Sequence, residues 1–446
     1  MTEGKPGRLI LEFAIPLLLG NLFQQFYSLV DTAIVGKFLG VDQLAAVGST
    51  GSINFLIIGF CMGICSGFAI PIAQRFGAKD ESGMRRCVAN SAWVSVIFAV
   101  VLTIVTVLLC RNILQWMRTP ENIIDDAWMY IVIIFAGIPV TILYNLTSAI
   151  IRAMGDSKTP VYFLVMSALL NIVLDLFCIL VLKMGVAGAA LATVISQAIS
   201  GICCLVYMIR KYEILRMQGT EGKADPELML RLTGMGVPMG LQFSITAIGL
   251  IMLQSANNAL GTACVAAFTA AMRIKMFFLC MLESLGIAMA TFCGQNYGAG
   301  KPERIWTGVK AASLMMIVYV AAVAIILWGF SEKFVLLFVD PSETEIIADA
   351  ALFLHISVSF FPVLGLLCIL RYSIQGAGYT KLAMFSGVSE MIARILVSVV
   401  AVPLWGFWAV CFGDPTAWVF ADAFLIPAFI YVYRRLRLIV ARERGD

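Results

Sequence analysis

The chain has 446 residues, of which 61% are hydrophobic and only 13% are charged. Soluble domains carry about 25% charged residues, so this composition excludes a soluble catalytic or nucleotide-binding protein. The formal net charge of +4 is small, and it gives no reason to expect nucleic-acid binding. We therefore expect an all-α polytopic membrane protein.

Apolar runs long enough to cross a membrane, about 20 residues each, recur along the whole sequence. Twelve are predicted, at 9–34, 44–72, 88–110, 127–151, 160–182, 186–209, 235–260, 263–293, 306–330, 350–373, 382–403 and 406–433. The polar segment between the sixth and seventh runs is too short to fold as a domain. The predicted organisation is an N-terminal lobe at 1–209, a cytoplasmic linker at 210–231 and a C-terminal lobe at 232–446.

Lysine and arginine residues indicate the orientation of the chain. Most of the 31 fall in loops on the side of the N-terminus, including Arg75, Arg85 and Arg210. Cytoplasmic loops of membrane proteins carry such an excess. We expect both termini to be cytoplasmic, and the protein to lie in the cell inner (plasma) membrane.

The two halves of the sequence carry the same pattern about 221 residues apart. The shared positions are Pro16 with Pro238, Gly40 with Gly261, and Gly77 with Gly298. Because each copy holds an even number of spans, both copies enter the membrane from the same face, which is typical of parallel transporter repeats. The copies differ in one respect: where the first has Asp31, the second has Met252 or Leu253.

Polar residues in the first copy have helical spacing. Gln24, Tyr27 and Asp31 are three and four positions apart, and Asn171 and Asp175 are four apart, so each set shares one helix face. A carboxylate in hydrocarbon is costly unless it is neutral or holds a cation. This pattern predicts a binding site for H⁺ or Na⁺.

Each of these residues also has a structural interpretation. Asp31 could mark the outer boundary of its span, and Asn171 could only hydrogen-bond a neighbouring helix. Pro16 falls inside the first span and removes a backbone hydrogen bond. It is either a hinge for the helix that carries Asp31 or a passive kink.

The second copy carries a different set of intramembrane charges. Glu283 lines a cavity as a cation-attracting group, or else it neutralises Arg273 or Lys275. Glu390 and Arg394 are four apart and fit an intrahelical ion pair. Two further acids, Asp414 and Asp422, remain unassigned.

The cysteines and the histidine give no metal site. The twelve cysteines lack the C-x-x-C spacing of zinc or redox motifs, and His355 is the single histidine. We expect no cofactor and no metal beyond a possible Na⁺.

Several of these motifs together resemble the multidrug and toxic compound extrusion (MATE) family. They are Pro16 through Asp31, Leu44-Ala45-Ala46-Val47-Gly48, Arg152-Ala153-Met154-Gly155-Asp156, Asn171 with Asp175, and Gly294-Gln295-Asn296-Tyr297-Gly298-Ala299. The resemblance implies twelve transmembrane helices in two pseudo-symmetric six-helix lobes that form a V. It also implies multidrug efflux and other xenobiotic transport in exchange for H⁺ or Na⁺.

The resemblance is closer to the DinF-like branch than to the NorM-like branch. In the DinF-like branch the first lobe holds the coupling site, whose residues would be Gln24, Asp31, Asn171, Asp175 and Thr193, with Pro16 as the hinge. The NorM-like branch uses acids on the seventh and tenth helices. Here the seventh helix has Gln242, and no acid lies between His355 and Arg371. Tyr27, Glu283 and Gln242 are candidates for the substrate cavity.

The expected function is secondary active antiport, not enzymatic catalysis. The substrate would be an organic, cationic and amphipathic compound or a metabolite, moved by alternating access of two lobes. The alternative is a lipid or lipid-linked oligosaccharide flippase of the same wider superfamily. The expected partners are the substrate and membrane lipids, without nucleic acid, and the expected state is a monomer.

Overall fold

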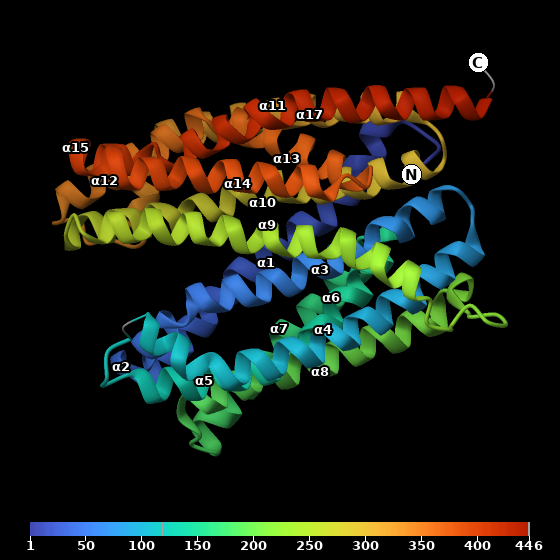
Figure 1. Cartoon of the computed structure of the whole chain (residues 1–446). Coiled ribbons are helices and arrows are strands. Elements are labelled where there is room, and N and C mark those ends of the chain that lie inside the picture. The colour runs from blue at the N-terminus through green and yellow to red at the C-terminus, as the bar shows by residue number, and fades with distance from the viewer. Residues whose placement is uncertain (118, 445–446) are drawn as a thin grey trace. The chain divides into compact units, whose positions relative to one another are not determined.

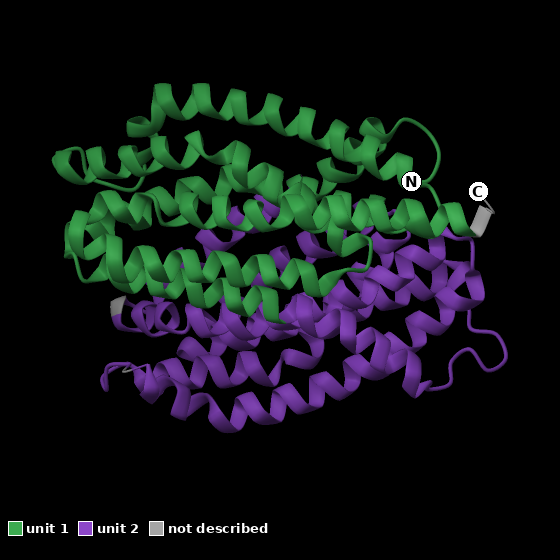
Figure 2. Cartoon of the chain, turned by 45° about the horizontal axis from the view of Figure 1, so that its top comes forward, with its two compact units in different colours: residues 1–18, 241–446 green, residues 19–240 purple. Residues whose placement is uncertain are grey.

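The computed structural model describes residues 1–117 and 119–444. Within these ranges the secondary structure is helical and contains no strand, which confirms the all-α polytopic class (Figure 1). The chain divides into two compact units: unit 1 comprises residues 1–18 and 241–446, and unit 2 comprises residues 19–240 (Figure 2). The boundaries fall inside helices α1 (Pro6–Phe38) and α9 (Pro226–Asn258), two residues after Pro16 and Pro238. The lobe boundaries expected from the repeat stay a prediction.

Unit 2 holds most of α1, the start of α9 and all helices between them. These are α2 (Val41–Ser49), α3 (Gly51–Gly77), α4 (Glu81–Trp116), α5 (Ile124–Ala136), α6 (Ile138–Ala153), α7 (Lys158–Leu176), the π-helix η1 (Phe177–Val181), α8 (Gly185–Lys211) and the short 3₁₀ helix η2 (Glu213–Leu215). Helix α6 packs against α3 and α8, and α7 packs against α8. Side chains such as Phe68 and Phe135 fill the interior of this unit.

Unit 1 holds the remainder of α9 and the later helices. These are α10 (Thr262–Gly298), α11 (Pro302–Val335), α12 (Thr344–Ser359), α13 (Phe361–Gly376), α14 (Thr380–Leu396), the π-helix η3 (Val397–Ala401), α15 (Val402–Trp405), α16 (Phe407–Cys411) and α17 (Gly413–Arg444). The main packing pairs are α10 with α13 and α14 with α17. Phe292, Phe353 and Phe361 are buried among these helices.

The structure supports the predicted spans. Among the described residues, ten helices are long and apolar enough to cross a membrane, and two bent pairs bring the number to twelve if each pair is one span. The bends, which the sequence did not predict, are 47° between α5 and α6 and 49° between α12 and α13. Pro139 and Pro362 each stand at the start of the second helix of a pair. Because proline lacks the backbone N–H that would continue the preceding helix, each span breaks there.

The repeat is visible in the backbone. Gly40 and Gly261 both have a strongly positive φ, 107° and 110°, at the turn after α1 and α9, a conformation that side chains disfavour. Each copy also has a π-helix in the last part of its fifth span, η1 and η3. These matched irregularities indicate two copies of one scaffold.

The segment between α8 and α9 is held firmly to α4 within unit 2. Arg85 Nε donates to Glu221 Oε2 at 2.6 Å, and Arg86 pairs with Asp225 at 2.7 Å. The backbone N–H of Asp225 donates to Asn90 Oδ1 at 2.8 Å. The hydrogen bond from Arg85 lowers the pKa of Glu221 from its ordinary 4.5 to about 2.

Loss of the Glu221 charge is expected to release this segment. Because the folded-state pKa of Glu221 is depressed, its contribution to stability is present above about 4.5 and is lost as pH falls toward about 2. We expect Glu221→Gln to mimic acidification at neutral pH, and trypsin to cleave at Arg216 or Lys223 several-fold faster. Glu213→Gln is the control, because the Glu213 side chain is largely exposed. Equal cleavage of the two variants would contradict this role for Glu221.

Candidate ion-coupling site

The polar residues expected from the first copy meet inside unit 2. Asp31 lies half-buried on α1, and Asp175 is fully buried at the end of α7, next to η1. Their carboxyl groups are close enough to interact directly. One turn before Asp31, the hydroxyl of Tyr27 hydrogen-bonds to the side-chain amide of Asn171. Two helices distant in sequence therefore supply one cluster.

Asn171 links the cluster to α8. Its amide makes the most contacts when its nitrogen faces Asp175 Oδ2, 3.0 Å away, because its oxygen then accepts the backbone N–H of Thr193, also at 3.0 Å. The hydroxyl of Thr193 donates to the carbonyl of Ala189 at 3.1 Å. Asn171 thus orients Asp175, and this contact goes beyond helix packing alone.

Charge compensation is missing from this cluster. Within the described part of the chain, no lysine or arginine forms an ion pair with Asp31 or Asp175, and Asp175 Oδ1 has no hydrogen-bond partner. A buried pair of carboxyl groups cannot stay doubly charged without a cation, because like charges repel and burial removes their hydration. The arrangement is suited to taking up a proton or a small cation.

Two residues differ from the predicted site: Tyr130 was not predicted but lies near the cluster, and Gln24 was predicted but is exposed. Tyr130 of α5 lies near Asp31, Asp175 and Tyr27, and it packs against the small apolar cluster formed by Ile34, Val35, Ile179 and Ala189. Tyr130 was not predicted, since the residues directly beside it along α5 are apolar. Gln24 is exposed on α1. Helix α1 continues without a break through Pro16, and the hinge role of Pro16 stays a prediction.

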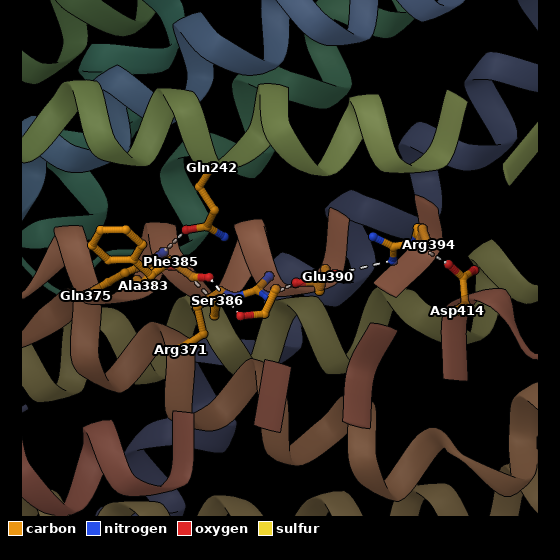
Figure 3. A network of polar contacts seen from close by, with 10 residues as sticks. Gln242, Arg371, Gln375, Ala383, Phe385, Ser386, Glu390, Arg394 and Asp414 are labelled. Atoms are coloured by element: carbon orange, nitrogen blue, oxygen red, sulfur yellow. Dashed lines mark hydrogen bonds and ion pairs between the residues drawn. The ribbon is translucent and has the colours of Figure 1, made fainter. Parts of the chain in front are cut away.

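Unit 1 carries a contrasting arrangement, which we call the buried charge network: Lys275, Arg371, Glu390, Arg394 and Asp414. Figure 3 shows four of its members, Arg371, Glu390, Arg394 and Asp414. Lys275 Nζ lies 2.5 Å from Asp414 Oδ2, and Arg394 Nε lies 2.9 Å from Asp414 Oδ1. Arg394 also pairs with Glu390 at 3.3 Å, and Arg371 pairs with the other oxygen of Glu390. Four helices, α10, α13, α14 and α17, are joined by these ion pairs.

The network corrects two sequence interpretations. The ion pair between Glu390 and Arg394 exists, but it does not satisfy itself, because each residue has a second partner on another helix. Lys275 pairs with Asp414 and therefore does not neutralise Glu283. Its ammonium group also lies over the rings of Phe353 and Trp418, at 4.9 and 5.8 Å.

Three further polar residues of unit 1 differ in their surroundings. Gln242 is buried, and its side-chain oxygen accepts from Gln375 Nε2 at 2.6 Å (Figure 3). Glu283 is exposed on α10 between buried neighbours. Asp422 is buried on α17, with Oδ1 unpartnered among the described residues.

Comparison with known proteins agrees with this architecture. The family model described as MatE matches residues 16–177 and 237–400, once in each copy of the repeat. The chain is a polytopic membrane transporter, and it belongs to the MATE family.

Individual relatives cover nearly the whole chain. The probable multidrug resistance protein YoeA of Bacillus subtilis is 30% identical over 439 residues, which is 96% of this chain and 94% of the relative. The probable multidrug resistance protein YpnP of the same organism is 30% identical and covers 84% of each chain. A solved structure described as the outward-facing conformation of a multidrug resistance MATE family transporter superposes with a TM-score of 0.87 at 24% identity, covering 98% of this chain and 97% of the other.

Proposed function

We propose that this transporter is a cation-coupled antiporter that exports organic, amphipathic cations or metabolites in exchange for H⁺ or Na⁺. The observation that carries the proposal is the pair of facing carboxyl groups, Asp31 and Asp175, with which no base in the described part of the chain forms an ion pair. In this proposal the pair binds the coupling ion, while Tyr27, Asn171 and Thr193 position it. Binding of the ion and of the substrate to different states of the protein would couple the two movements.

The proposal also covers the location, the oligomeric state and the family branch of the protein. We place the protein in the inner membrane as a monomer with cytoplasmic termini, and in the DinF-like branch because the uncompensated acids lie in the first copy. Alternating access would use Pro16 as a bend point. A lipid flippase is not favoured, since the relatives described above are named as multidrug resistance proteins.

Transport in proteoliposomes tests the proposal. An inward-directed H⁺ or Na⁺ gradient should drive organic cations outward against their own gradient, and one of the two ions should suffice. Movement that only follows the substrate gradient, whichever ion is imposed, would contradict antiport.

Glu283 is proposed to attract the cationic part of the substrate. It is an exposed carboxylate on an otherwise buried stretch of α10, and none of the ion pairs of the buried charge network engages it. We expect Glu283→Gln to raise the apparent KM for permanent organic cations roughly tenfold, the effect of losing about 1.4 kcal/mol of attraction, and to leave uncharged substrates unaffected. Glu332→Gln, at an exposed position near the end of α11, is the control. An unchanged KM for every cation tested would remove Glu283 from the substrate site.

A further inference from the structure

A pocket lies within unit 1 where α11 begins and α17 ends. Its volume is about 320 Å³, which falls in the range of about 300–1,000 Å³ that is usual for small-molecule sites. The described residues that line it are Gly300, Lys301, Pro302, Glu303, Arg304, Arg437, Val440 and Ala441. Three of these residues are bases and one is an acid, so the lining carries two surplus positive charges. A pocket with this charge attracts an anion.

Two of the three bases are held in place by neutral groups. Lys301 Nζ donates to the backbone carbonyl of Thr2 at 3.1 Å. The guanidinium of Arg304 donates to the carbonyl of Gly4 at 3.0 Å and to Asn296 Oδ1 at 2.9 Å. Carbonyl and amide oxygens carry no net charge, so these hydrogen bonds fix the two side chains but leave their positive charges uncompensated.

The corresponding corner of unit 2 is neutralised. Helix α4 has the place in the first copy of the repeat that α11 has in the second. The two bases near the start of α4, Arg85 and Arg86, pair with the acids Glu221 and Asp225 of the segment before α9. In unit 1 the segment that meets the start of α11 is the end of α17, and it brings a further base, Arg437. The surplus charge is therefore a property of the second copy.

Aromatic side chains place the pocket at the surface of the membrane. Trp306 of α11 and Tyr433 of α17 lie one helical turn nearer the apolar part of their helices than Glu303 and Arg437, and their ring centroids are 5.4 Å apart. Trp306 is 37% exposed, and Lys310 Nζ lies 5.4 Å from its ring. Tryptophan and tyrosine gather at the level of lipid headgroups, and lysine extends its ammonium group toward the same level. The pocket, one turn further out, thus lies at the depth of lipid phosphate groups.

We propose that this pocket binds the phosphate group of an anionic phospholipid, in the leaflet on the side of the chain termini. Lys301 and Arg304 neutralise the phosphate, and the planar guanidinium of arginine presents paired N–H donors that match two phosphate oxygens. Val440 and Ala441 supply an apolar wall for the start of an acyl chain. A soluble phosphate has the same oxygens, but it has no group for this wall and no reason to lie beside the aromatic pair. The site is independent of the proposed coupling ion and substrate.

The test uses purified full-length protein in detergent and phosphatidylglycerol with brominated acyl chains, because bromine quenches the fluorescence of a tryptophan that it contacts. Trp306 is the reporter, and its share is the quenching that Trp306→Phe lacks. We expect phosphatidylglycerol to saturate this share at a several-fold lower concentration than brominated phosphatidylcholine, whose headgroup has no net charge. Unlabelled phosphatidylglycerol should displace the brominated lipid.

Substitutions in the pocket should change the affinity in both directions. Lys301→Gln and Arg304→Gln should each raise the half-saturating concentration of phosphatidylglycerol about fivefold. Glu303→Gln should lower it by a similar factor, because the variant removes the one acid of the lining; a misfolded protein would not show this gain. The control for the basic pair is Arg434→Gln with Arg442→Gln, which removes two exposed bases of α17 outside the pocket and should have little effect.

Three results would overturn the proposal. Equal quenching of Trp306 by the two brominated lipids would show that the pocket does not recognise the headgroup charge. Equal weakening by the paired pocket substitutions and by the paired control would assign the effect to the general charge of this surface. Displacement of phosphatidylglycerol by inorganic phosphate at an equal concentration would assign the pocket to a soluble anion.

Discussion

Asp175→Asn and Asp31→Asn are each expected to abolish ion-driven export while leaving membrane insertion and folding intact. Asp175 is fully buried, receives the Asn171 amide and faces Asp31, so the variant keeps the shape of the cluster and removes only its capacity to take up a cation. Every 1.4 kcal/mol of lost discrimination between the two states reduces coupling about tenfold. Export against a gradient should therefore fall by a factor of at least about ten in each variant.

The control for this prediction is Asp42→Asn, because Asp42 is an exposed carboxylate on the neighbouring helix α2. Efflux of a fluorescent organic cation from energised cells, normalised to protein in the membrane, measures the effect. Equal efflux in Asp42→Asn and Asp175→Asn would show that Asp175 does not bind the coupling ion.

Asp414→Asn is expected to cause the largest loss of stability. Asp414 receives both Lys275 and Arg394 in a site where Lys275 is only 1% exposed. Removal of one partner from a buried pair costs about 3–5 kcal/mol, because the remaining charge stays buried without compensation. We expect a lower Tm and poor recovery of folded protein from membranes.

A double substitution separates the ion pair from a general effect on packing. Lys275→Met removes the charge that Asp414→Asn leaves uncompensated, so the double variant should be more stable than Asp414→Asn alone, although Arg394 still lacks one partner. Thermal unfolding of the two variants, with Asp340→Asn as the control, measures this difference. An additive loss in the double variant would contradict the role of the ion pair between Lys275 and Asp414.

Helical periodicity explains why the members of the candidate site could be grouped from the sequence, whereas their role in ion coupling stays a prediction. Asn171 and Asp175 are four residues apart in an apolar run, and Tyr27 and Asp31 are also four apart, so helical periodicity alone places each pair on one face. The meeting of the two pairs is a tertiary contact, which only the family resemblance implied. Tyr130 was not predicted because its place near the cluster depends on the tertiary packing of α5, and the residues directly beside it in the sequence are apolar.

The buried charge network contains ion pairs that could not be predicted from the sequence. Glu390 and Arg394 were paired correctly because they are one helical turn apart. Lys275 and Asp414 are 139 residues apart and Arg371 and Glu390 are 19 apart, so their pairing follows from helix packing and no local pattern carries it. The bends near Gly137 and Phe360 differ, because Pro139 and Pro362 mark them in the sequence although each run was predicted as one continuous span.

The two units differ in whether their intramembrane acids are paired with basic residues. In unit 2 the half-buried Asp31 and the buried Asp175 face each other, and no base among the described residues pairs with them, whereas in unit 1 the acids of the buried charge network are held by fixed lysine and arginine charges. Fixed ion pairs stabilise a scaffold, and uncompensated carboxyls take up mobile cations. The coupling ion is therefore expected at Asp31 and Asp175.

The most direct measurement compares two kinds of transport in proteoliposomes that contain the double variant Asp31→Asn/Asp175→Asn. Exchange of labelled for unlabelled substrate needs no net ion movement, whereas accumulation against a gradient needs the coupling ion. We expect the double variant to retain exchange but no longer to respond to either an H⁺ or a Na⁺ gradient. Gradient-driven accumulation equal to that of the wild type would contradict it.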